Sequence, residues 1–354
     1  METTYSETPA HNSNVISFLS KAKICKGLRC FAILTIISFT VVFYATSTEE
    51  TIAALSHLNV GFLILAGVLQ LADIALGALR NHILVRKLKP GISPWVCFKA
   101  QLANEFAAAV TPGQSGGGPA WVYILYRNGI PIASAAAVSV IVFISTLFFF
   151  LSITTTSVFY LDQHFSIHTI LRLLQYGFVT CTALFLLILV SIWLPYRMTR
   201  LIRFIARFMG RFGKHWGECS VRLGEKIILT LKHYQRNCVE ILKKDPITVL
   251  KTFLITGVYY FVKLNIAYII LLGIGIEIDY LTAIAVLALL RFILYFTPTP
   301  GGSGVAEISI AVLVSLIMPT YLLPLFTILY RSYHLFLPAG FGAWVMISEL
   351  KKAA

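Results

Sequence analysis

Apolar residues gather in long runs along the chain, and short polar stretches separate these runs. An α-helix needs about 20 predominantly apolar residues to cross the hydrocarbon core of a bilayer, and most of the runs reach or approach that length. The pattern therefore predicts about six membrane-spanning helices. We place them at residues 28–44, 58–79, 132–160, 171–194, 248–272 and 322–347.

Two further apolar regions are interrupted by nearly the same short string. Residues 111–116 read Thr-Pro-Gly-Gln-Ser-Gly, and residues 299–304 read Thr-Pro-Gly-Gly-Ser-Gly. The apolar stretches beside the first string are too short to cross a bilayer, so they predict a helical hairpin that enters and leaves on one side. The stretches beside the second string are longer, which leaves two interpretations open, a second hairpin or two tilted crossings.

Lipid restricts where such breaks are tolerated. Because no water is present at membrane depth to satisfy free backbone groups, a proline-glycine break survives only where protein buries it or where it lines a cavity. Two breaks in corresponding positions of two half-chains are typical of a transporter whose binding site lies between its repeats. Three predicted spans separate the two strings, so the hairpins enter from opposite sides. The predicted fold is an all-α polytopic membrane protein with about six full spans and two re-entrant helical hairpins in an inverted-topology repeat.

Lysine and arginine predict which loops face the cytoplasm. Basic clusters precede the first span, follow the second, fill the insert after the fourth and end the chain. The opposite loops carry acidic residues such as Glu49 and Asp279. With both strings treated as hairpins, the loops follow the positive-inside rule with both termini in the cytoplasm. We expect a multi-pass protein of the cell (inner) membrane.

Composition agrees with this prediction and limits the class of protein. Hydrophobic residues make up 58% of the chain, charged residues 12%, and the mean hydropathy is +0.81, as in an integral membrane protein. We expect residues 1–20 to form a disordered cytoplasmic tail and residues 21–354 a single membrane domain, without room for a separate large catalytic domain. The net charge of +14 is explained by cytoplasmic loops, so no nucleic acid partner is expected.

A basic insert at residues 197–247 separates two of the predicted spans. Arginines recur in it at spacings of three and four residues while apolar side chains fill another face, which is typical of an amphipathic helix. Such a helix suits the anionic lipids of the inner leaflet, and a solvated cytoplasmic loop is the alternative. The arginines expected to meet these lipids are Arg200, Arg203, Arg207 and Arg211.

Each repeated string leads into an apolar helix, so each places a helix N-terminus inside the protein. Unpaired N–H groups and the positive end of the helix dipole favour an anion there, such as a lipid phosphate. No lysine follows the glycines, which argues against a nucleotide P-loop. The alternative is that the glycines only permit close helix packing or kinks. The residues predicted to shape the helix ends are Gly113, Ser115, Gly116, Gly301, Ser303 and Gly304.

Ionisable residues inside apolar segments cost roughly 2.5 to 3.5 kcal/mol each on insertion scales and mark functional sites by default. In this chain they are Asp73, Lys99, Glu105, Lys263, Arg291, Glu307 and Arg331. We expect a buried ion pair between Glu307 and Arg331, which acts either as a gate or headgroup clamp or as a structural pair. Arg291 either binds a lipid phosphate or extends to the interface.

The remaining candidates are secondary. Glu105 is expected to partner Lys99 or Lys263, and Asp73 is expected to cross-link helices together with Gln70. The cysteines show no Cys-x-x-Cys pair and are expected to be free thiols. We find no catalytic constellation and expect no cofactor and no metal.

The second string and its surroundings resemble a known family. Residues 297–307 read Thr-Pro-Thr-Pro-Gly-Gly-Ser-Gly-Val-Ala-Glu, and Tyr330-Arg331 and the glycines Gly340 and Gly342 follow. This pattern resembles the membrane domain of the lysylphosphatidylglycerol synthase/flippase family, and residues 111–129 are similar to that family's first glycine segment. The resemblance implies transport of charged phospholipids or polyprenyl-linked lipids, without the cytosolic aminoacyl-transferase domain that some members carry.

Three functions follow from these observations. The first is a flippase-like lipid translocase that moves an anionic, aminoacylated or polyprenyl-phosphate lipid between leaflets, with Arg291 and Arg331 attracting the headgroup and Glu307 holding or releasing Arg331. The second is the membrane component of phosphatidylglycerol lysyltransferase-type lipid aminoacylation, with a separate transferase as its partner. The third is a polar-solute or ion transporter. An enzyme acting on its own is not expected, and association into a homo-oligomer is left open.

Overall fold

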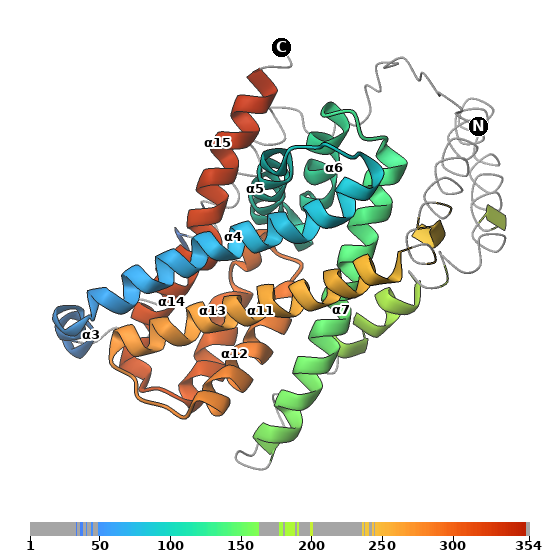
Figure 1. Cartoon of the computed structure of the whole chain (residues 1–354). Coiled ribbons are helices and arrows are strands. Elements are labelled where there is room, and N and C mark those ends of the chain that lie inside the picture. Colours follow the sequence, from blue (N-terminus) through green and yellow to red (C-terminus); the bar gives the residue numbers. More distant parts are fainter. Residues whose placement is uncertain are drawn as a thin grey trace, which may run out of the picture.

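The computed structural model describes residues 49–162 and 245–351 continuously, together with isolated residues between positions 33 and 44 and between positions 177 and 243. All regular elements in this part of the chain are helices (Figure 1). The predicted tail, most of the first span, most of the span at 171–194 and nearly all of the basic insert lie outside the described residues.

The helices fall into two groups along the chain. The first group is α3 (Glu49–Ala54), η1 (Leu55–His57), α4 (Val60–Leu88), α5 (Pro94–Val110), η2 (Pro112–Gln114), α6 (Gly117–Arg127) and α7 (Ile132–Asp162). The second group is α11 (Pro246–Ile274), α12 (Tyr280–Tyr295), η3 (Pro300–Gly302), α13 (Val305–Leu313), η4 (Val314–Leu316), η5 (Thr320–Leu322), α14 (Leu323–Arg331), η6 (Ser332–Phe336) and α15 (Leu337–Lys351).

Three of the described helices, α4, α7 and α11, are long and apolar enough to cross a membrane. They overlap the predicted spans at 58–79, 132–160 and 248–272, although α4 continues to Leu88. The last predicted span, at 322–347, is helical throughout, but the π-helical turn η6 divides it into α14 and α15. The protein is therefore an all-α membrane protein, as predicted.

Local sequence signals explain where several helices begin. The side chains of Asn59 and Ser93 accept hydrogen bonds from the first backbone N–H groups of α4 and α5. Asp245 and Asp279 do the same for α11 and α12, through the amides of Thr248 and Thr282. These residue types are the preferred N-caps because their oxygens satisfy donors that have no partner within the helix.

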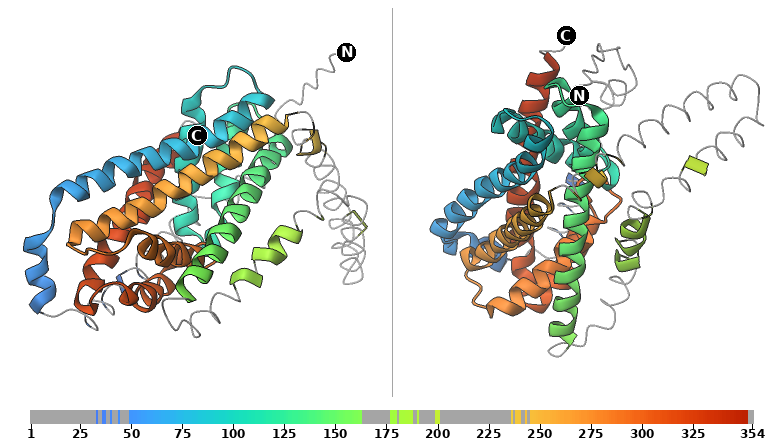
Figure 2. Two further views of the ribbon diagram at one scale, coloured as in Figure 1. Left: turned by 60° about the horizontal axis from the view of Figure 1, so that its bottom comes forward. Right: turned by 45° about the vertical axis from the view of Figure 1, so that its right-hand side comes forward.

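The two groups repeat one plan, which consists of a long helix, a helical hairpin broken by the glycine string, and a second helical run. The two leading helices, α4 and α11, pack side by side in both views of Figure 2. At one end Lys87 forms an ion pair with Asp245 at 2.6 Å, and at the other the amide of Asn59 donates to the carbonyl of Gly273 at 2.9 Å. The start of each helix thus lies beside the end of the other, so α4 and α11 are antiparallel.

The two hairpins open toward opposite ends of the molecule (Figure 1). The base of the α5–α6 hairpin meets the end of α15, where Lys99 and Glu349 are 2.7 Å apart. The base of the α12–α13 hairpin meets the end of α7, where the hydroxyl of Tyr160 donates to Asp279 at 3.3 Å. Between these ends the turns η2 and η3 pack against each other. The second string joins two short helices, α12 and α13, that pack against each other.

Candidate functional site

The first glycine turn is closed by its own threonine. The Thr111 hydroxyl donates to the carbonyl of Ala107 at 2.6 Å and accepts from the amide of Gly116 at 2.8 Å. A Cβ atom on Gly116 would lie 2.7 Å from Thr111 Cγ2, so this position excludes any side chain. The turn leaves α5 and enters α6 within a few residues.

The second glycine turn has the same backbone conformation at its two central residues, although Gly304 has a positive φ and the corresponding Gly116 a negative one. Gly113 and Gln114 have φ values of +60° and +57°, and the corresponding Gly301 and Gly302 have +58° and +71°. Glycine adopts such values freely, whereas a residue with a Cβ atom is strained by roughly 1–2 kcal/mol in the left-handed region. The one position that differs between the two strings is therefore the one where the first turn is strained.

The Gln114 side chain reaches the second hairpin from this strained position. Its Nε2 donates to the carbonyls of Leu294 and Tyr295, at 3.4 and 3.3 Å, which lie at the end of α12. Gln114 thus joins the first turn to the end of α12, the helix that leads into the second turn.

The predicted ion pair between Glu307 and Arg331 is present. Arg331 Nη2 lies 3.5 Å from Glu307 Oε1, and the two side chains are only 3% and 2% exposed. Arg331 also donates to the Gly301 carbonyl at 2.9 Å and to the Ser303 hydroxyl at 3.0 Å. Arg331 therefore holds the second turn in place, in addition to neutralising Glu307.

Glu307 also caps the helix on which it lies. Its Oε2 accepts from the amide of Gly304 at 2.7 Å, the first residue before α13. A carboxylate at a helix N-terminus is favourable because it meets the positive end of the dipole. The α13 terminus, which the sequence suggested as an anion site, thus already carries an anionic group of the protein itself.

A pocket of about 70 Å³ lies where the two turns meet. This space is enough for a few water molecules or one small polar group, since a single water needs about 10–15 Å³. Both hairpins and the final helical run contribute to it. The lining residues are Glu105, Ala108, Ala109, Gln114, Arg291, Leu294, Tyr295, Gly301, Tyr330, Arg331, His334 and Leu335.

Several polar atoms at the pocket have no hydrogen-bond partner among the described residues. They are the Nε atoms of Arg291 and Arg331 and both ring nitrogens of His334. His334 is only 6% exposed and lies in the π-helical turn η6, a distortion that is frequent at functional sites. Buried polar atoms are normally satisfied, so these atoms indicate a polar occupant of the pocket.

Of the secondary candidates, Lys99 and Lys263 do not line this pocket, whereas Glu105 does. Lys263 lies 2.6 Å from Asp73, which also accepts from Gln70 at 3.3 Å, so Asp73 does cross-link helices α4 and α11. Glu105 borders the pocket but accepts a hydrogen bond from Gln101 at 2.9 Å. The predicted pairing of Glu105 with Lys99 or Lys263 is therefore wrong, because both lysines bond to other carboxylates.

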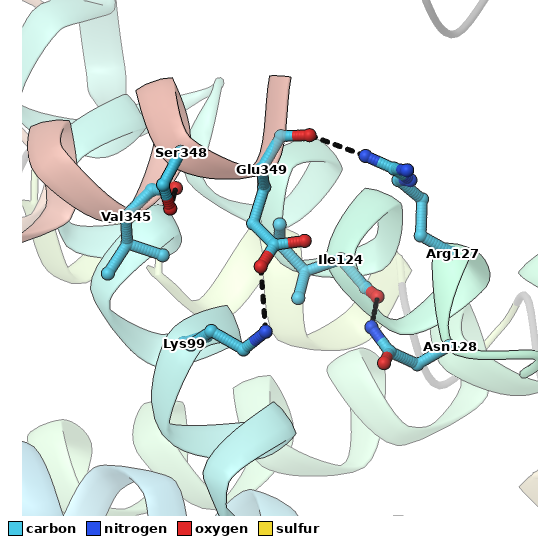
Figure 3. A network of polar contacts seen from close by, with 7 residues as sticks. All are labelled: Lys99, Ile124, Arg127, Asn128, Val345, Ser348 and Glu349. Atoms are coloured by element: carbon cyan, nitrogen blue, oxygen red, sulfur yellow. Dashed lines mark hydrogen bonds and ion pairs between the residues drawn. The ribbon is translucent and has the colours of Figure 1, made fainter. Parts of the chain in front are cut away.

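Lys99 belongs to a polar network at the base of the first hairpin (Figure 3). Its Nζ donates to Glu349 Oε1 at 2.7 Å, and Arg127, from the other arm of the hairpin, donates to the backbone carbonyl of Glu349. Asn128 closes α6 by donating to the Ile124 carbonyl at 2.7 Å. Both arms of the hairpin are thereby fixed to the end of α15.

Four pocket residues with polar side chains were not among the predicted site residues, namely Gln114, Tyr295, Tyr330 and His334. A signal existed for Gln114, because it is the only residue that differs between the two strings. The other three are aromatic side chains in apolar helices, where the sequence alone does not distinguish pocket walls from core.

Comparison with known proteins relates the whole region to one family. The family model described as "Lysylphosphatidylglycerol synthase TM region" matches residues 28–342. A "UPF0104 membrane protein" of Archaeoglobus fulgidus is 28% identical over 300 residues, which cover 83% of this chain and 89% of that protein.

Proposed function

Because the chain belongs to the family of the lysylphosphatidylglycerol synthase transmembrane region, we propose that it is a flippase-like lipid translocase. It moves an anionic, aminoacylated or polyprenyl-phosphate lipid between leaflets. The observation that carries this proposal is the meeting of two broken helices, from opposite ends of the molecule, at a pocket bordered by Arg291 and Arg331. This arrangement is the one expected for a binding site between inverted repeats.

The two ends of the described structure differ in charge, which supports the predicted orientation. Arg86, Lys87 and Lys89 lie near the base of the first hairpin, where Lys89 donates to the Asn128 carbonyl at 2.8 Å. The opposite end carries Glu277 and Asp279 beside the base of the second hairpin. By the positive-inside rule, the first hairpin re-enters from the cytoplasm and the second from the other side of the cell (inner) membrane.

The chemistry of the pocket suits the phosphate of a lipid. Arginine binds phosphate through paired, charge-assisted hydrogen bonds, and Arg291 is the arginine whose guanidinium is not already committed to the glycine turns. The volume of about 70 Å³ admits the phosphate group alone, so the acyl or prenyl chains remain in the bilayer. Because glycine has no side chain, the glycine turns allow the backbone to approach the phosphate closely.

Transfer of a labelled phospholipid between leaflets of proteoliposomes tests the proposal. Arg291→Ala is expected to lower the transfer rate at least about tenfold, because a hydrogen bond to a charged group contributes about 1.5–3 kcal/mol. Arg291→Lys retains the charge, so its transfer rate is expected to lie between those of the native chain and Arg291→Ala. Arg86→Ala removes an exposed arginine outside the pocket and serves as the control.

Three results would contradict or redirect the proposal. Unchanged transfer in Arg291→Ala with an intact fold contradicts a headgroup site at this pocket. Transport of ions or sugars without lipid supports the polar-solute transporter. Lipid aminoacylation that requires both this chain and a separate transferase supports the second alternative, which the word synthase in the description of the family favours.

A further inference from the structure

We propose that Asp73 and Lys263 form a proton-binding site that couples lipid transfer to a proton gradient, an inference that rests on the proposed translocase function. The two residues face each other across the antiparallel helices α4 and α11, with Lys263 Nζ 2.6 Å from Asp73 Oδ2. The side chain of Lys263 is 3% exposed and that of Asp73 is 1% exposed.

A contribution to stability does not by itself account for this buried ion pair. A buried ion pair gains little net stability, because the loss of hydration offsets the attraction between the charges, and apolar residues of similar size often do as well. Ionisable groups inside membrane helices are more often parts of ion or proton pathways. Asp73 and Lys263 lie in the middle of helices that are long enough to span the bilayer.

The site contains two acceptor oxygens that are not used in the charged state. Among the residues that the structure describes, Asp73 Oδ1 and Gln70 Oε1 are buried oxygens without a hydrogen-bond partner. Gln70 already contacts Asp73 through its Nε2 at 3.3 Å. When Asp73 takes up a proton, the new O–H group requires an acceptor, and a half-turn of the Gln70 amide supplies Oε1 for it. Protonation thus gives a partner to an oxygen that has none in the charged state.

Lys263 also has a second partner ready when Asp73 becomes neutral. Its ammonium lies 4.7 Å from the centre of the Tyr259 ring, within the range of a cation–π contact. The step is balanced, since one proton adds to the Asp73 carboxylate, Lys263 keeps its own proton, and the net charge of the pair rises from zero to +1. Release of the proton reverses the step.

The added charge lies close enough to the pocket to affect an anion there. Gly77, one helical turn after Asp73, packs against the side chain of Gln101, and Gln101 donates to the pocket residue Glu105 at 2.9 Å. The titratable and charged groups around the pair are Tyr259, Glu105, Arg291, His334 and Arg80. Since a net positive charge favours the phosphate, and the phosphate in turn favours the proton, the two bind cooperatively, and coupling of this kind is typically worth 5–150-fold in affinity.

The experiment measures lipid transfer and proton movement in the same proteoliposomes, which carry a labelled phospholipid and an enclosed pH dye. An imposed proton gradient of one polarity is expected to accelerate transfer by the native chain about tenfold, with protons moving alongside lipid. Asp73→Asn resembles the protonated carboxyl, so it is expected to transfer lipid at a rate that no longer depends on the gradient, without proton movement.

A second measurement, made first on the native protein, tests the inference even if the Asp73→Asn variant does not fold. Infrared difference spectra of the native protein are expected to show the band of a protonated carboxyl appearing as a short-chain lipid phosphate is added at constant pH, and to lose that band in Asp73→Asn. Glu277→Gln, which changes an exposed carboxyl outside the pocket, is the matched control and keeps the band. Lipid transfer that is independent of the gradient, without proton movement or carboxyl band, overturns the inference and leaves the translocase intact. Absence of lipid transfer under all conditions overturns the proposed function itself.

Discussion

At the residue scale, Gln114 and Gly302 show that equivalent turn positions can hold either a residue that bridges to the other hairpin or an unstrained glycine. Both residues adopt positive φ values in equivalent turns, but only Gln114 has a side chain that reaches across to the other hairpin. Its two hydrogen bonds, at 3.3 and 3.4 Å, are long and therefore weak. The strain at this position indicates that the side chain serves the pocket more than it serves stability.

Substitutions of Gln114 separate these contributions. Gln114→Gly removes the strain together with the bridge, whereas Gln114→Ala removes the bridge and keeps the strain. We expect the glycine variant to be more stable than the alanine variant by about 1–2 kcal/mol, and both to transfer lipid more slowly than the native chain. Thermal unfolding in detergent and the liposome assay measure the two effects. Equal stability of the two variants would contradict the assigned strain.

The Glu307–Arg331 pair makes a second prediction at this scale. Arg331→Met leaves Glu307 as an unpaired buried charge, and breaking such a pair costs about 3–5 kcal/mol. The double variant Arg331→Met with Glu307→Gln removes both charges while the amide oxygen still accepts from Gly304, so it is expected to recover most of that loss. Thermal unfolding of the single and double variants measures the difference. A double variant no more stable than the single one would contradict a role for charge.

At the element scale, the crossing of α5 and α15 depends on one glycine. A Cβ atom on Gly342 would lie 2.1 Å from the Leu102 carbonyl oxygen, whereas a Cβ on Gly340 would meet nothing within 4 Å. Gly342→Ala is expected to destabilise the protein by about 1–3 kcal/mol or more because the helices must move apart. Gly340→Ala is expected to be neutral or stabilising by up to about 1 kcal/mol, since alanine favours a helix. Thermal unfolding distinguishes the two variants, and an equal loss of stability in both would contradict this account.

Asp245 joins the start of α11 to the end of α4 and makes the protein sensitive to acid at this joint. The hydrogen bond from Lys87, followed by that from the Thr248 amide, lowers the pKa of Asp245 from 3.8 to about 2. Because the pKa is lower in the folded protein, the stabilisation is present above the unfolded pKa near 4 and is lost as the pH falls to about 2. The difference in unfolding temperature between the native chain and Asp245→Asn is therefore expected to shrink across that range. A difference that stays constant would contradict the assignment.

The sequence predicted the positions of helices more accurately than the contacts between side chains. The long apolar runs located α4 and α11, because a run of about 20 apolar residues is enough to predict a membrane span. The partner of Glu105 was predicted wrongly, since Gln101 lies one helical turn away while the choice between Lys99 and Lys263 depended on tertiary packing. The π-helical turn at Ser332–Phe336 has no periodic signature, so the sequence predicted a plain helix there.

At the scale of the whole molecule, the repeat is visible in the sequence only as two short strings, yet it organises both halves. The leading helices run antiparallel, the hairpins open at opposite ends, and the strings meet between them. The sequence predicted this arrangement because the spans between the strings could be counted and the charges of the loops compared. It did not predict that the anionic Glu307 would occupy one of the two helix termini, which moves the candidate headgroup site toward Arg291.

The inverted arrangement predicts that the bases of the two hairpins are accessible from opposite sides of the membrane. Lys89 lies near the base of the first hairpin, Glu277 near that of the second, and both are exposed. In a background without native cysteines, Lys89→Cys is expected to react with a membrane-impermeant maleimide only after the cytoplasmic face is opened, and Glu277→Cys in intact cells. Reaction of both positions from the same side would place the two hairpins on one face. In that case the pocket could not alternate between leaflets, and the translocase mechanism would lose its structural basis.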